Sequence, residues 1–160
     1  YTSNYAGTLL PGIREYTVTP GEKTTTISGK GKAGLKQEEN YYFFYLPVCY
    51  KGITGKSYAY YNTSRSKNLY LPASVDEKYS YDIQLPENLT LCTPIQEKKI
   101  DNPIGSFKIT LTSEGSSLHI ELALQIKKQL ITPAEYPAFR SLITEWTDRT
   151  RKPILFKTVQ

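Results

Sequence analysis

Apolar and polar residues alternate strictly in the second half of the chain. Between residues 79 and 85 every second side chain is Tyr, Ile or Leu, and between residues 118 and 126 every second side chain is Leu or Ile. A period of two is typical of a strand with one buried face. A turn at residues 113–116 (SEGS) connects the second of these segments to a similar one at 107–111. We therefore expect residues 107–111 and 118–126 to form an antiparallel hairpin.

Other segments are less regular but also favour strands. The run YYFFYLPV at residues 41–48 has the highest β propensity in the chain, and its aromatic residues would occupy both faces of a strand. Short strands are also expected at residues 24–28, 69–71 and 153–157. Turn residues separate these segments, which is the pattern of an antiparallel sandwich.

One segment has the features of a helix start. In ITPAEY, Thr132 is placed to cap the helix, Pro133 follows at a position where its missing N–H costs little, and Glu135 completes a capping box. Ile131 and Tyr136 have the spacing of a hydrophobic staple across this cap.

The residues that follow continue a helical pattern. Phe139, Leu142, Ile143 and Trp146 share one face and are expected to pack on a core. Pro137 lies at the edge of the first turn and favours a later start of the regular helix. The predicted fold is therefore mainly β, an antiparallel β-sandwich with one C-terminal helix at about residues 133–150 and a short final strand.

Length and composition allow one domain of this kind. The chain has 160 residues, 39% of them hydrophobic, and no apolar run long enough to cross a membrane. We expect residues 1–15 to be a lead-in from a preceding domain and residues 16–160 to form the sandwich. The absence of Met from the chain, including position 1, favours a processed product or a piece of a longer polypeptide. The net charge of +5 comes from scattered Lys and Arg residues, so no nucleic-acid partner is expected.

The candidate chemistry is sparse. A cysteine-protease site requires a Cys and a His within hydrogen-bond reach, but the only histidine, His119, lies on the polar face of a predicted strand. Neither Cys49 nor Cys92 begins a recognisable helix, and whether the two form a disulfide stays open. No metal-ligand spacing or phosphate-binding loop is present. We expect no catalytic residues, no metal and no cofactor in this chain.

Tyrosine is the one abundant candidate for binding. The chain has 14 tyrosines, and a tyrosine ring suits both protein interfaces and stacking on sugars. Some of these residues are expected to be core or to cover sheet edges. The candidate ligand-binding residues are Tyr41, Tyr45, Tyr58, Tyr60 and Tyr61.

Several segments occur in an order that resembles a known family. They are residues 65–72 (RSKNLYLP), 79–88 (YSYDIQLPEN), the long strand 118–126, the helix start at 131–140 and the closing ILFK at 154–157. Together they look like the C-terminal β-domain of unknown function in Bacteroidetes-type transglutaminase-like proteins, which carry a papain-like core. The resemblance implies a periplasmic or extracellular parent protein. It also implies that any catalysis belongs to an upstream core of the same polypeptide.

Three functions follow as hypotheses. The first is a non-catalytic accessory module that packs on the upstream transglutaminase-like core and positions it, with Thr132, Glu135, Tyr136, Phe139 and Trp146 in structural roles. The alternative is a carbohydrate- or cell-wall-binding module that uses the surface tyrosines. A third hypothesis is an assembly domain that pairs an edge strand with a neighbouring molecule.

Overall fold

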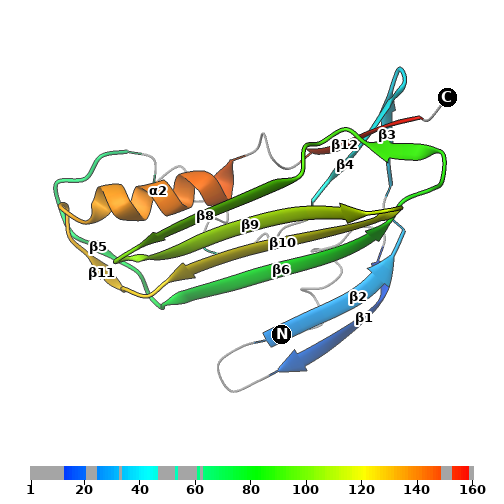
Figure 1. Cartoon of the computed structure of the whole chain (residues 1–160). Helices are drawn as coiled ribbons and strands as arrows, with labels where there is room; N and C mark the ends of the chain where they lie inside the picture. The colour runs from blue at the N-terminus through cyan, green and yellow to red at the C-terminus, as the bar shows by residue number, and fades with distance from the viewer. Residues whose placement is uncertain are drawn as a thin grey trace.

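A four-stranded antiparallel sheet forms the centre of the molecule (Figure 1). The computed structural model describes residues 13–20, 25–32, 34–46, 53, 61, 63–148 and 153–158. The sheet has the strand order β6-β10-β9-β8. Its strands are β6 (Val75–Gln84), β8 (Gln96–Asn102), β9 (Gly105–Glu114) and β10 (Ser117–Ile126). The hairpin expected from residues 107–111 and 118–126 is confirmed. Strands β9 and β10 pair along their whole length, with Gly105 opposite Ile126 at one end and Glu114 opposite Ser117 at the turn.

A second sheet covers one half of the inner face of this central sheet. Its strand order is β3-β4-β12-β7, and all neighbouring strands are antiparallel. The last strand of the chain lies in its interior. The strands are β3 (Lys36–Glu38), β4 (Tyr41–Tyr45), β7 (Leu89–Leu91) and β12 (Pro153–Thr158).

The helix α2 (Tyr136–Thr147) covers the other half, as Figure 1 shows, beside the short pair β5 (Leu69–Tyr70) and β11 (Leu130–Ile131). A further hairpin, β1 (Ile13–Pro20) with β2 (Thr25–Gly31), lies apart from the other strands in this view. The sequence-based fold class, mainly β and sandwich-like with one helix and a final strand, is confirmed. The lead-in predicted for residues 1–15 stays a prediction, since residues 1–12 lie outside the described part.

Each cover has its own apolar cluster on the central sheet. Under α2 the sheet contributes Phe107, Ile109, Leu124 and Ile126, and under the second sheet it contributes residues nearer the β9–β10 turn. Leu122 contacts both clusters. The second cluster contains Leu46, Leu85, Leu89, Leu111, Leu118, Ile120, Ile154 and Phe156.

The helix begins three residues later than the start predicted at residue 133. Its N-cap is Glu135 rather than Thr132, and Pro137 lies in the first turn. Half of the predicted capping box forms, since the Thr132 N–H donates to Glu135 Oε2 at 3.1 Å. The Thr132 hydroxyl also donates to Glu135 Oε2, at 3.0 Å, and the observed N-cap, Glu135, makes no side-chain cap hydrogen bond. In a helix that began at Pro133, the N–H of residue 137 would have to donate to the Pro133 carbonyl. Pro137 has no N–H and its ring would clash with that carbonyl, which explains the displaced start.

The rest of the predicted helix behaves as expected. Tyr136, Phe139, Leu142, Ile143 and Trp146 are all buried on the central sheet. The helix ends at Thr147, before the predicted end near residue 150. No described helix is long and apolar enough to cross a membrane.

The turn between β8 and β9 anchors the helix to the sheet. Asn102 Oδ1 accepts hydrogen bonds from the N–H groups of Ile104 and Gly105, and Asn102 Nδ2 donates to the Ala138 carbonyl on α2. A Cβ atom at Gly105 would lie 1.9 Å from the Gln125 carbonyl oxygen, so only glycine fits there. This turn therefore fixes the position of the helix along the strands.

Candidate functional site

The outer face of the second sheet carries exposed aromatic residues. Successive residues of β4 point to opposite faces, so Tyr42 and Phe44 pack on the inner cluster. Tyr41, Phe43 and Tyr45 point outward, and the Tyr41 and Tyr45 residues are 46% and 52% exposed. We call these three residues, together with Leu155 opposite Phe43 on β12, the aromatic face.

Contacts within the aromatic face hold the rings in place. Phe43 and Tyr45 meet edge to face, with centroids 5.7 Å apart and ring planes at 86°. Lys36 Nζ, from β3, lies 5.6 Å from the centroid of the Tyr45 ring. This arrangement provides a fixed apolar surface with a cation at its side. It does not provide a row of coplanar rings, which is what stacking on a sugar chain would use.

The other tyrosine candidates are not part of this face. Tyr61 packs against the cluster under α2, where its ring meets Phe139 edge to face at 5.4 Å. The Tyr61 carbonyl accepts a 2.8 Å hydrogen bond from the Tyr136 hydroxyl. The centroid of the Tyr136 ring also lies 5.7 Å from the Arg65 guanidinium. Tyr61 therefore has contacts typical of a structural residue, and its role in ligand binding stays a prediction. Tyr58 and Tyr60 lie outside the described residues.

The outer face of the central sheet differs from the aromatic face because it is polar and charged. His119 on β10 lies between two carboxylates: its Nδ1 is 2.7 Å from Asp82 Oδ1 and its Nε2 is 3.5 Å from Glu121 Oε1. Hydrogen bonding to Asp82, and secondarily to Glu121, raises the pKa of His119. Lys108 and His119 in turn lower the pKa of Glu121.

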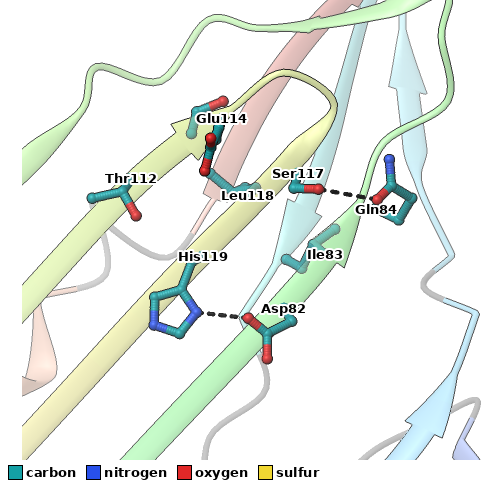
Figure 2. Close-up of a pocket in the computed structure, with 9 residues that line it drawn as sticks. Asp82, Ile83, Gln84, Thr112, Glu114, Ser117, Leu118 and His119 are labelled. Carbon is teal, nitrogen blue, oxygen red and sulfur yellow. Dashed lines mark hydrogen bonds and ion pairs between the residues drawn. The ribbon is translucent and has the colours of Figure 1, made fainter.

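A shallow hollow of about 530 Å³ lies over this end of the sheet. Figure 2 shows His119 turned toward Asp82, with Thr112 and Glu114 on the neighbouring strand and Ser117 bonded to Gln84. The sequence correctly placed His119 on a polar strand face. It did not indicate Asp82 as its partner, because that contact depends on the pairing of β10 with β6.

This arrangement does not resemble a nucleophilic catalytic site. Both ring nitrogens of His119 face carboxylates, so neither is directed at a hydroxyl or thiol. Cys92, a free cysteine, belongs to the other layer, where its N–H donates to the Leu155 carbonyl. The described residues include no group of three His, Cys, Asp or Glu side chains placed to hold a metal ion. Cys49 lies outside the described residues.

A family match covers most of the folded part of the chain. Residues 40–156 match the family described as a domain of unknown function with a solved structure, DUF3858. This chain belongs to the DUF3858 family. The resemblance to a β-domain of unknown function is therefore confirmed at the level of the domain.

One solved structure is similar to this DUF3858 domain. It is the crystal structure of a protein from Parabacteroides distasonis that bears the name "putative protease". The two are 31% identical, with a TM-score of 0.66 over 76% of this chain and 24% of the Parabacteroides chain. The present chain therefore spans about a quarter of that protein's length. The comparison with curated proteins gives no match.

Proposed function

We propose that this chain is a non-catalytic accessory module of a longer exported bacterial polypeptide, and that it packs on a transglutaminase-like, cysteine-protease-like core. The similarity to one quarter of a larger protein that is named a protease supports this role. In this proposal the chemistry belongs to the core, and the module holds the core in position.

The aromatic face is the observation on which the proposal mainly rests. Tyr41 and Tyr45 are about half exposed, while the inner side chains of the same sheet are packed. An exposed apolar patch with polar surroundings is typical of a surface that another protein covers. Tyrosine and phenylalanine are also enriched in the buried centres of protein interfaces.

Hydrogen–deuterium exchange tests this proposal directly. The exchange of β4 and β12 amides is compared between the 160-residue chain and the full polypeptide that contains it. We expect slower exchange in the full polypeptide, because the core covers these strands. Equal exchange of β4 and β12 in the two samples would overturn the docking role.

A pair of variants in the full polypeptide adds a functional measurement. Phe43→Ser combined with Tyr45→Ser should return β4 exchange to the rate of the isolated chain and lower the activity of the core. Thr112→Ser, on the exposed outer face of the central sheet, is the matched control and should change neither quantity.

The second candidate is a carbohydrate- or cell-wall-binding module. The exposure of Tyr41 and Tyr45 on one face favours it. The perpendicular rings of Phe43 and Tyr45, and the cation beside Tyr45, favour the docking role instead. Calorimetric titration of the chain with peptidoglycan fragments and soluble polysaccharides distinguishes the two. Heat of binding that disappears in Tyr45→Ala would support the glycan role.

A further inference from the structure

Two lysines lie on the same side of the second sheet as the aromatic face. Lys36 on β3 is opposite Phe43, and Lys157 on β12 is opposite Tyr41. Residues opposite each other in a ladder share a face of the sheet, so both lysines point outward with the aromatic rings. Both lysines are exposed. Their Cα atoms lie about 12 Å apart, because β3 and β12 flank β4 and the two positions differ by two residues along the strands.

The charges of these two lysines are not neutralised within the chain. The ion pairs of the described residues include neither Lys36 nor Lys157. Lys36 Nζ instead lies 5.6 Å from the centroid of the Tyr45 ring. Lys108, on the outer face of the central sheet, differs because its Nζ lies 3.3 Å from Glu121 Oε2. The aromatic face therefore has two positive charges at its sides that a partner can neutralise.

We propose that the core presents carboxylates to Lys36 and Lys157 where it covers the aromatic face. The inference rests on the proposed docking function and adds the chemistry of the surface that docks. A core that covers β4 and β12 removes water from both ammonium groups. Removing water from a charge is unfavourable unless an opposite charge replaces the lost hydration. Asp or Glu residues of the core supply that charge, and the net charge of +5 attracts an acidic surface from a distance.

The positions of the two lysines in the sheet make this requirement strict. A lysine can avoid burial by extending its side chain to the border of a contact. The contact of Lys36 with the Tyr45 ring keeps its ammonium group beside the aromatic face. Lys157 is on β12, which lies between β4 and β7. A partner that covers β4 and β12 therefore covers Lys157 as well, and needs an acidic residue there.

A third charge fixes the orientation of the partner. Glu38 on β3 lies opposite Tyr41, which separates it from Lys157 on the other neighbouring strand. A carboxylate of the core at this corner would be repelled, whereas carboxylates beside Lys36 and Lys157 are attracted. The three charges are not related by symmetry, so a rotated partner would bring like charges together.

Charge reversal in the full polypeptide tests the inference. The exchange of β4 amides is compared between the wild type and Lys36→Glu combined with Lys157→Glu, at low ionic strength. We expect exchange about tenfold faster in the variant, because each attraction becomes a repulsion. Lys78→Glu combined with Lys127→Glu is the matched control, since both positions are exposed lysines outside the second sheet. The control has the same net charge and should stay within about twofold of the wild type.

The same measurements separate this inference from the docking function. In the isolated chain, Lys36→Glu with Lys157→Glu should leave β4 exchange within about twofold of the wild type, because no core is present. Equal exchange of the wild type in the isolated chain and the full polypeptide would mean that docking itself is wrong. A wild type that is protected in the full polypeptide, with the same protection in both double variants, would leave docking intact and rule out the acidic surface.

Carbodiimide crosslinking of the full polypeptide identifies the partner residues. The reagent activates a carboxylate, a lysine amine forms an amide with it, and the displaced oxygen leaves with the reagent as a urea. We expect an amide between Lys36 or Lys157 and an Asp or Glu residue outside residues 1–160, detected by mass spectrometry. A mixture of isotope-labelled and unlabelled polypeptide shows whether an amide joins two molecules. Amides to a second copy alone, or none to the rest of the polypeptide, would overturn the inference.

Discussion

The helix and the second sheet cover the same face of the central sheet, yet their outer surfaces differ. The outer side of α2 carries exposed polar residues such as Arg140, Ser141 and Thr144. The outer side of the second sheet carries Tyr41, Phe43 and Tyr45 instead. The helix therefore presents a polar outer surface, whereas the second sheet presents an aromatic one. This difference is the reason why the proposed docking role places the core on the second sheet.

The largest effect is expected from the helical cover. Phe139 has 0% exposure and contacts both Tyr61 and Tyr136. Phe139→Ala should lower the free energy of unfolding by about 3–5 kcal/mol, as measured by urea denaturation, because it leaves a cavity under the helix. Arg140→Ala, the neighbouring exposed position, should change it by less than about 0.5 kcal/mol. Similar losses for the two variants would contradict the packing described for α2.

Two adjacent phenylalanines provide an internal comparison within the sheet cover. Phe44 packs on the inner cluster and Phe43 belongs to the aromatic face. Phe44→Ala should lower the free energy of unfolding of the isolated chain by about 2–3 kcal/mol. Phe43→Ala should lower it by about 1 kcal/mol and should instead weaken docking to the rest of the polypeptide. The reverse order of stabilities would mean that the two faces of β4 have been exchanged.

The smallest expected effect is a dependence on pH at the start of the helical cover. Lys128, followed by the Thr132 N–H and hydroxyl, lowers the pKa of Glu135 from 4.5 to about 2. A carboxylate with a lowered pKa contributes stability that is present above its unfolded pKa and is lost as the pH falls through the folded value. Its contribution should therefore disappear between about pH 4.5 and pH 2.

Thermal unfolding of Glu135→Gln across this range measures the contribution. The variant should show a flatter dependence of melting temperature on pH than the wild-type chain. Glu114→Gln, at an exposed position beside the β9–β10 turn, is the control and should keep the wild-type slope. An unchanged slope in Glu135→Gln would show that this carboxylate does not contribute to folding.

The sequence predicts those parts of the fold in which one face of an element is uniformly apolar. Strands β9 and β10 and the stripe on α2 meet this condition, and β6 meets it between Tyr79 and Ile83. The pattern fails for β8, where Gln96, Lys98, Ile100 and Asn102 face inward and only one of them is apolar. Lys98 is accommodated there because its Nζ lies 2.5 Å from Oε1 of Glu145 on α2 and forms an ion pair with it. That partner is distant in sequence, so no local pattern reveals the strand.

The candidate site was predictable only in part, for a related reason. Alternation along β4 places Tyr41 and Tyr45 on one face, but it does not say which face the core covers. Tyr61 belonged to the same sequence cluster and is instead held under the helix by Phe139 and Tyr136. The contact between His119 and Asp82 likewise depends on strand pairing across 37 residues.

Leu122 lies at the boundary between the two apolar clusters and contacts both. The backbone hydrogen bonds of β10 therefore run without interruption beneath the helix and beneath the second sheet. Loss of either cover exposes part of a strand that the other cover also needs. The two halves should consequently unfold in one cooperative transition. A ligand that binds the aromatic face and stabilises the second sheet should then also raise the free energy of unfolding of the helix.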